Sequence, residues 1–202
     1  MTLDLDTRTG WPDDLCIFLD QYPREAWLSH RNFGERMRFW MGVHGGFREL
    51  GTALGAATAD FREGEVTPDR FRQWFVPRLN YLLSHLHTHH QIEDFDYFPV
   101  LAEAEPRLAR GFEVLESDHE AIHRAIARLA ETANAFIAVA PGDRDSLLAS
   151  GERYADASDR LIAQLMRHLD DEEDLIVPLV LDRGEEPLGI SWEDHLRRMQ
   201  GG

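Results

Sequence analysis

The chain has 202 residues, 43% of them hydrophobic and 29% charged, a balance typical of one globular domain and not of a disordered chain. Its 37 acidic and 21 basic residues give a net charge of −16, which opposes binding to nucleic acid or to an anionic membrane surface. A single cysteine, Cys16, excludes an internal disulfide and suits the reducing cytoplasm. Because the sequence shows neither a long apolar run nor a basic, apolar leader, we expect neither a membrane span nor export.

The first predicted elements are an arm and two long helices. Residues 1–34 form the N-terminal arm, in which Pro12 predicts the start of a short helix. Apolar residues at three- and four-residue steps predict a helix over residues 35–62. A Thr-Pro start signal opens a second helix over residues 67–94, and Pro99 predicts a stop or a bend after it.

Two further helices and a tail complete the chain. The same periodicity predicts helices over about residues 106–139 and 145–178, and residues 184–202 follow as a C-terminal tail. No strand-like alternation of useful length interrupts this pattern. Because the helices are long and their connections short, residues 35–183 are predicted to form an all-α, up-down-up-down antiparallel four-helix bundle.

An internal repeat relates the second predicted helix to the fourth. Histidine, acidic, proline and leucine positions agree when the two segments are superimposed. The aligned pairs are His89 with His168, Glu93 with Glu172, Pro99 with Pro178, Leu82 with Leu161 and Leu86 with Leu165. A chain built of two similar helix pairs would place its two His-x-x-x-Glu units on opposing helices, a symmetry that suits a site for two metal ions.

Histidines and carboxylates recur on these predicted helices at four-residue spacing, and residues four apart share one helix face. The candidate metal ligands are His44, His89, Glu93, His119, His123, His168 and Glu172. Imidazole and carboxylate suit first-row metal ions, and two bridging carboxylates with a solvent-derived bridge would nearly fill two octahedral shells. One position would stay open for a small molecule such as dioxygen. A single His-x-x-x-Glu pair is an ordinary surface contact, but two copies in register favour metal binding.

Taken in order, these motifs resemble the ligand set of haemerythrin-like (HHE cation-binding) domains over about residues 40–180. The matching motifs are His44, His89-x-x-x-Glu93, Asp118-His119-x-x-x-His123 and His168-x-x-x-Glu172. The resemblance implies a non-haem di-iron centre, with two Fe ions inside a four-helix bundle. It further implies one iron held by His119, His123 and His168, a second iron held by His44 and His89, and bridges from Glu93 and Glu172.

The resemblance also implies a range of functions. Members of the family bind dioxygen reversibly, sense oxygen, iron or redox state, or store iron, and some act on peroxide or nitric oxide. We therefore expect a protein that binds dioxygen or a related small molecule for sensing, carriage or detoxification. A peroxide- or nitric-oxide-consuming enzyme and an iron store are the alternatives. With no signalling domain attached, a sensor would act on a second copy of the chain or on another protein, through the arm or the tail.

Four residues near the predicted ligands leave the ligand set open. The oxygen-carrying haemerythrins have a five-residue His-to-Asp spacing, whereas here the four-step Glu172 is the natural ligand and Glu173, at the five-step position, competes with it. His85 and His90 compete with His89, but only His89 matches the repeat, so we expect the other two outside the ligand set or at the surface. Tyr97, one turn further along the same face, is either a ligand, a hydrogen-bond donor to a bound molecule, or a core residue.

Glycine is enriched around the histidine of the first helix. Gly42, Gly45 and Gly46 each cost up to about 1 kcal/mol inside a helix. We expect these glycines to permit close helix packing or a channel beside the metal. The alternative is a locally frayed turn of the helix.

One motif fits a different class of protein. His119-Glu120-Ala121-Ile122-His123 has the His-Glu-x-x-His pattern of zinc metalloproteases, in which the glutamate is the general base. That reading leaves the histidines of the other helices without a role, and on a helix Glu120 points about 100° away from His119. Ferritin-like di-iron oxygenases are a second alternative, but they use Glu-x-x-His pairs with carboxylates in the majority.

Overall fold

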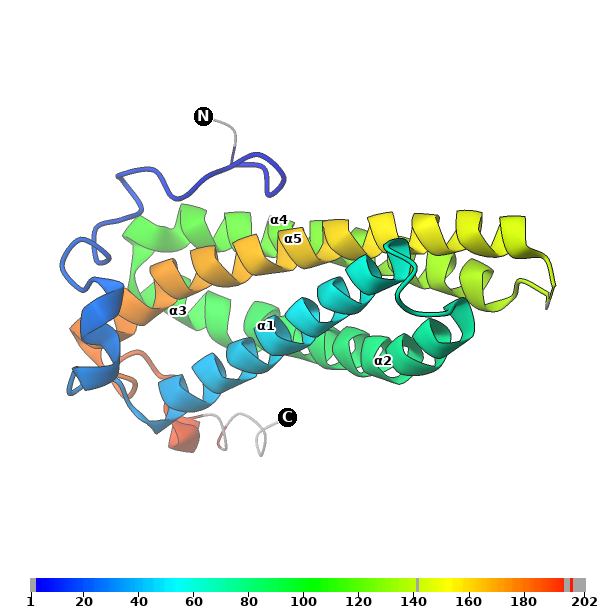
Figure 1. The fold of residues 1–202 in the computed structure, drawn as a ribbon. Helices are drawn as coiled ribbons and strands as arrows, with labels where there is room; N and C mark the ends of the chain where they lie inside the picture. The colour runs from blue at the N-terminus through cyan, green and yellow to red at the C-terminus, as the bar shows by residue number, and fades with distance from the viewer. Residues whose placement is uncertain (1–2, 141, 195–196, 198–202) are drawn as a thin grey trace. The chain divides into compact units, whose positions relative to one another are not determined.

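The computed structural model describes residues 3–140, 142–194 and 197, and these residues form helices and turns without a strand (Figure 1). The elements are η1 (Arg24–Ser29), α1 (Glu35–Arg62), α2 (Pro68–Ile92), η2 (Glu93–Tyr97), α3 (Phe98–Ala104), η3 (Pro106–Leu108), α4 (Ala109–Ile137) and α5 (Arg144–Arg183). The predicted all-α fold is therefore confirmed. The up-down-up-down order of the bundle and the boundaries 1–34, 35–183 and 184–202 stay predictions.

The described residues divide into two compact units, and the four long helices α1, α2, α4 and α5 each contribute to both. The first unit takes its residues from Met1–Gly45, His89–Asp118 and Arg167–Gly202. The second unit comprises Gly46–Thr88 and His119–Met166. Each unit has its own buried side chains and is described by itself below.

The second predicted helix does not stop near residue 94. It passes from α2 into η2, a π-helical turn, and continues as α3. Across this turn the Phe98 N–H donates to the carbonyl of Glu93, five residues back. Pro99 has no N–H to continue the ordinary α-helical ladder, and one wider turn accommodates it without ending the helix. The predicted bend is thus a π-turn that begins at Glu93.

The last helix also extends beyond its predicted end. Helix α5 contains Pro178 and ends at Arg183. Gly184 stops it, because its backbone adopts φ +87°, a conformation open to glycine, while its N–H donates to the Val180 carbonyl at 2.8 Å.

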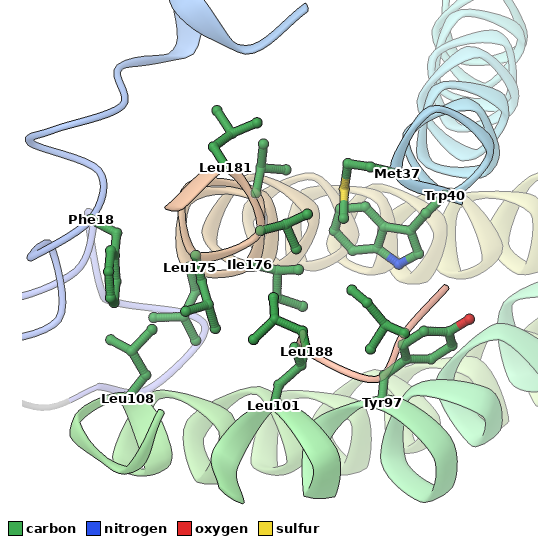
Figure 2. Packing of buried hydrophobic residues seen from close by; sticks show 14 of the residues in the cluster. Phe18, Met37, Trp40, Tyr97, Leu101, Leu108, Leu175, Ile176, Leu181 and Leu188 are labelled. Carbon is green, nitrogen blue, oxygen red and sulfur yellow. The ribbon is translucent and has the colours of Figure 1, made fainter. Parts of the chain in front are cut away.

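The N-terminal arm and the tail are parts of the core of the first unit. Pro12 is followed by isolated turns and not by the predicted helix, because so short a segment gains too few helical hydrogen bonds to offset nucleation. Leu15 and Phe18 of this segment are buried in the core instead. Figure 2 shows Phe18 of the arm and Leu188 of the tail in one cluster with Leu101 and Leu108. Tail residues 195–196 and 198–202 lie outside the described part of the chain.

The core of the second unit is aromatic. Its five main rings are Phe61, Phe71, Phe75, Phe136 and Tyr154. The Phe61 ring stacks on that of Phe71 with centroids 4.8 Å apart. Gly151 on α5 is buried against this cluster, and a Cβ added there would collide with the Phe61 ring.

The close helix packing expected at the three glycines around His44 is wrong, and the channel beside the metal stays a prediction. A Cβ added at Gly42, Gly45 or Gly46 would meet no atom within 4 Å among the residues that the structure describes. These glycines therefore do not serve close helix packing, and they leave helix α1 with a lower intrinsic helical propensity than alanine would give it.

We expect opposite stability changes from alanine at two of these helical glycines. Gly151→Ala should lower the free energy of unfolding by about 1–3 kcal/mol, because the new methyl group overpacks the buried aromatic cluster. Gly46→Ala should raise it by roughly 0.5–1 kcal/mol through helix propensity alone. Urea denaturation followed by circular dichroism measures both, and equal effects of the two substitutions would contradict this packing.

Candidate metal centre

Four buried side chains of the first unit bring their ligand atoms together. They are His44 on α1, His89 on α2, Glu93 at the start of η2, and Glu172 on α5. All four ligand atoms lie within 4.8 Å of one another. These are four of the seven ligands predicted from the sequence, and three of them, His89, Glu93 and Glu172, come from the two copies of the repeat.

Short distances within this cluster join ring nitrogens to each other and to carboxylate oxygens. The Nε2 atoms of His44 and His89 are 3.0 Å apart. His89 Nε2 lies 2.9 Å from Glu93 Oε1, and His44 Nε2 lies 3.5 Å from Glu172 Oε2. Imidazole lone pairs and carboxylate oxygens that converge in this way form the donor set of a first-row metal ion.

Glu172 provides the clearest sign that a cation belongs here. Its side chain is fully buried, and neither carboxylate oxygen has a hydrogen-bond partner among the described residues. Burial and the neighbouring charge of Glu93 raise the pKa of the Glu172 carboxyl well above its usual range. A buried carboxylate without donors is costly, and a metal cation would compensate its charge and occupy its lone pairs.

The cluster is held by donors and acceptors around it. The Trp40 indole N–H donates to Glu93 Oε1 at 2.7 Å. His44 Nδ1 lies 2.9 Å from Glu173 Oε1, and since a carboxylate only accepts, Nδ1 carries the proton and Nε2 turns its lone pair to the cluster. Burial lowers the pKa of His44, but its hydrogen bond with Glu173 and the nearby charge of Glu93 outweigh burial and leave that pKa raised. The five-step carboxylate Glu173 therefore orients a histidine from outside the cluster.

His168 and His90 lie beside each other in the first unit. Both side chains are fully buried, and their ring centroids are 5.4 Å apart. His168 Nε2 lies 3.5 Å from Glu172 Oε2, and its Nδ1 lies 3.4 Å from Asp118 Oδ2. Sequence reasoning set His90 aside because only His89 fits the repeat. The signal that was missed is its place one residue further along the helix, which turns it about 100° from His89 toward another neighbour.

The remaining predicted ligands, His119 and His123, lie on the part of α4 that belongs to the second unit. His119 is buried, and the ring of the partly buried His123 lies 5.4 Å from that of His87. Their membership of the ligand set stays a prediction. Glu120 between them is exposed, with its carboxylate 3.8 Å from Arg124.

His85, a predicted rival of His89, is exposed and lies against Tyr81, with ring centroids 4.0 Å apart. Its side chain therefore stays at the surface of α2, in the second unit, as expected for a residue outside the ligand set.

A small cavity of about 20 Å³ adjoins the Glu93 carboxylate. It is lined by Arg36, Met37, Trp40, Glu93, Tyr97, Leu101, Ile176 and Ile190. Figure 2 shows several of these side chains, with Met37 and Trp40 on one side and the Tyr97 ring opposite. The Arg36 guanidinium lies over the Tyr97 ring at 5.1 Å from its centroid. This volume holds one molecule about the size of water.

Comparison with known proteins gives one match. The model of the Hemerythrin HHE cation binding domain matches residues 36–180. No curated protein and no solved structure matches the chain. No helix in the described part of the chain is both long enough and apolar enough to span a membrane.

Removing the carboxylate that orients His44 should weaken metal binding without emptying the cluster. Glu173→Ala should lower the affinity for Co²⁺ about 10- to 100-fold, the usual effect of losing an outer partner of a histidine ligand. The matched control is Asp170→Ala, because Asp170 also lies near Arg24, at 3.9 Å, but its side chain is 48% exposed whereas that of Glu173 is 2% exposed. Optical titration with Co²⁺ measures both affinities, and equal values would contradict the role of Glu173.

Proposed function

Because the chain belongs to the haemerythrin HHE cation-binding family over residues 36–180, we propose that it is a non-haem di-iron protein that binds dioxygen or a related small molecule. Sensing, carriage and detoxification are the roles such binding would serve. The family binds metal cations, and the His and Glu cluster supplies donors of the right chemistry.

The position of Glu172 carries the proposal of two metal ions. Its Oε2 atom lies 3.5 Å from the Nε2 atom of His44 and 3.5 Å from that of His168. This position between two histidines, with no hydrogen bond to either, supports a carboxylate shared by two ions. In the proposed set His44 and His89 hold one ion, His119, His123 and His168 hold the other, and Glu93 and Glu172 serve both.

Iron bound by this set would supply two accessible oxidation states and an open coordination position. The protein's own residues determine what can reach it. Trp40 holds Glu93 by its indole N–H, and apolar side chains form most of the adjoining cavity wall. A cavity of about 20 Å³ admits a molecule of very few atoms. We therefore propose a small, uncharged ligand such as dioxygen.

Turnover of peroxide or nitric oxide at the same centre is the second candidate. The observation that favours it is Tyr97, which lines the same cavity as Glu93 and carries a phenol hydroxyl, a group that can donate a proton in catalysis. Iron storage would use the same donors without that cavity.

The zinc metalloprotease alternative is disfavoured by the side chain of Glu120. That side chain is 77% exposed, whereas the adjacent His119 is buried. A general base has to reach the water on the ion that its neighbouring histidines bind, and a carboxylate in solvent beside Arg124 does not.

The metal content of three variants tests the ligand set. The wild-type protein expressed with iron should contain about two irons per chain. Glu93→Ala and Glu172→Ala should lose most of that metal, because each removes a shared carboxylate. Glu120→Ala removes an exposed glutamate of α4 and should retain the metal. Elemental analysis measures all four proteins. One zinc and no iron in the wild type would overturn the di-iron proposal, and loss of activity with metal retained in Glu120→Ala would revive hydrolysis.

The ligand is tested on the reduced, iron-loaded protein. Reversible binding predicts an optical change that appears when dioxygen is admitted and disappears when it is removed. Peroxide turnover predicts instead that the iron-loaded protein consumes peroxide faster than the metal-free protein. If neither occurs in protein that retains its iron, storage becomes the better account.

A further inference from the structure

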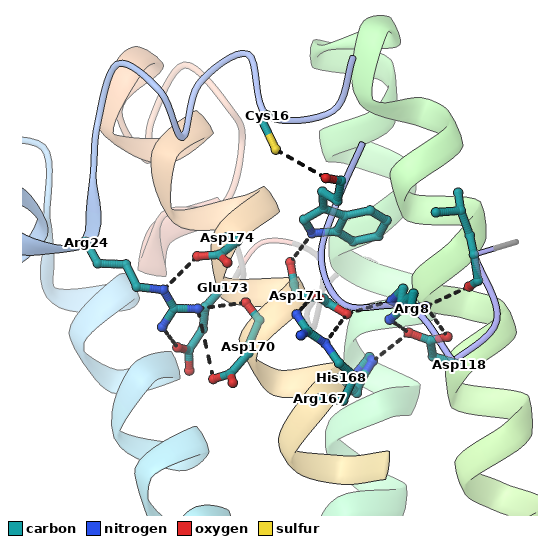
Figure 3. Close-up of polar contacts among 12 residues, drawn as sticks. Arg8, Cys16, Arg24, Asp118, Arg167, His168, Asp170, Asp171, Glu173 and Asp174 are labelled. Carbon is teal, nitrogen blue, oxygen red and sulfur yellow. Dashed lines mark hydrogen bonds and ion pairs between the residues drawn. The ribbon is translucent and has the colours of Figure 1, made fainter. Parts of the chain in front are cut away.

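Arg8 carries a guanidinium group from the N-terminal arm into the interior of the first unit. Its side chain is fully buried. Figure 3 shows the group between two aspartates. It makes a two-pronged contact with Asp118, with Nη1 at 2.9 Å from Oδ1 and Nη2 bonded to Oδ2, and its Nε donates to Asp171 Oδ2 at 2.6 Å. A buried charge with this many bonds is fixed in one geometry.

Asp118 connects Arg8 to a histidine of the candidate centre. Its Oδ2 atom, which accepts from Arg8, also lies 3.4 Å from His168 Nδ1 (Figure 3). Holding Nδ1 sets the ring so that Nε2 faces Glu172 at 3.5 Å. Asp171, the second partner of Arg8, immediately precedes Glu172 on α5. Arg8 thus holds the ligand-bearing turn of α5 and the aspartate that orients its histidine.

A second arginine of the arm stands in the same relation to the other histidine. Arg24 Nη1 lies 3.4 Å from Glu173 Oε2, and Glu173 Oε1 lies 2.9 Å from His44 Nδ1. Figure 3 shows Arg24 reaching Asp174 as well as Glu173. Both His44 and His168 therefore have a carboxylate at Nδ1, and an arginine of the arm holds each carboxylate.

The arm lies outside the part of the chain that the family model matches, which begins at residue 36. The two arginines therefore lie outside the matched cation-binding domain. Arginine suits this position, because its planar fork binds a carboxylate in a fixed orientation that a lysine ammonium does not enforce.

We propose that the N-terminal arm positions the metal ligands, with Arg8 acting through Asp118 on His168 and Arg24 acting through Glu173 on His44. The inference rests on the proposed metal centre. Because orientation of a ligand and binding of its metal are linked, docking of the arm and metal affinity strengthen each other by the same factor. Arg8 and Arg24 are positioning residues, since neither contacts the proposed ions.

Optical Co²⁺ titration of three arginine variants tests this proposal. Arg8→Ala should lower the affinity about 10- to 100-fold and change the visible Co²⁺ spectrum, as loss of an outer partner does. Arg8→Lys should recover only part of the affinity. The matched control is Arg62→Ala in the second unit, because Arg62 is likewise an arginine held by carboxylates, those of Glu152, Asp156 and Asp159. It should leave Co²⁺ affinity and spectrum unchanged even if it lowers stability.

Two further measurements keep the proposal testable if Arg8→Ala folds poorly. Arg24→Ala replaces a side chain that is 41% exposed, so the variant should fold, and it should lower Co²⁺ affinity a few-fold at low salt. In the wild-type protein, Co²⁺ should slow hydrogen exchange of the arm amides, including that of Arg8, which donates to the Asp4 carbonyl at 2.9 Å.

The outcomes separate this proposal from the function on which it rests. If the wild type binds Co²⁺ and both arm variants bind it with unchanged affinity and spectrum, the arm has no positioning role and the metal centre stands. If the wild type binds no metal, the proposed function fails and the role of the arm fails with it.

Discussion

Glu172 brings a carboxylate into the interior of the first unit, where Glu93 and Glu173 are buried beside it. Taking carboxylates from water costs several kcal/mol each unless donors or cations compensate them. Glu93 accepts from the Trp40 indole, and Glu173 accepts from the ring of His44. Glu172 has no hydrogen bond among the described residues. These three buried carboxylates need compensating charge and hydrogen-bond donors. The buried imidazoles, the arginines of the arm and the proposed metal ions provide them.

The two copies of the internal repeat do not give two equal halves of the site. Pro99 and Pro178 occupy the same place in the repeat, yet a π-turn begins at Glu93 whereas Glu172 lies inside an uninterrupted α5. Glu93 consequently receives a donor from α1, and Glu172 stands between ring nitrogens of His44 and His168. Since π-turns are concentrated at functional sites, the departure from symmetry at Glu93 agrees with its role in the cluster. The two carboxylates are chemically inequivalent before any metal is bound.

The parts of this molecule that sequence could predict are those set by local periodicity. The bounds of α1 and the faces of His89 with Glu93 follow from three- and four-residue spacing, which is a property of one helix. The burial of His90 beside His168 depends on which neighbour its helix face meets, and no single helix shows that. The contact of Arg8 with Asp118 joins residues 110 positions apart, and neither residue type nor spacing signals it. Likewise, a proline can stop, kink or widen a helix, so Pro99 predicted a disturbance without specifying a π-turn.

The arm contributes apolar area as well as charge, and this limits how it can respond to metal. Leu15, Phe18 and Trp27 are buried in the same core as the side chains of α3 and α5. Exposing a large apolar side chain costs about 1.5–3 kcal/mol, so full release of the arm would lose more free energy than the weakening of one outer hydrogen bond could supply. Coupling between the arm and the centre therefore operates within the docked state, through the orientation of Asp118 and Glu173. A partner protein that senses whether metal is bound would therefore have to recognise the surface of the arm in its docked position. Detaching the arm costs more free energy than metal binding at one oriented ligand could supply.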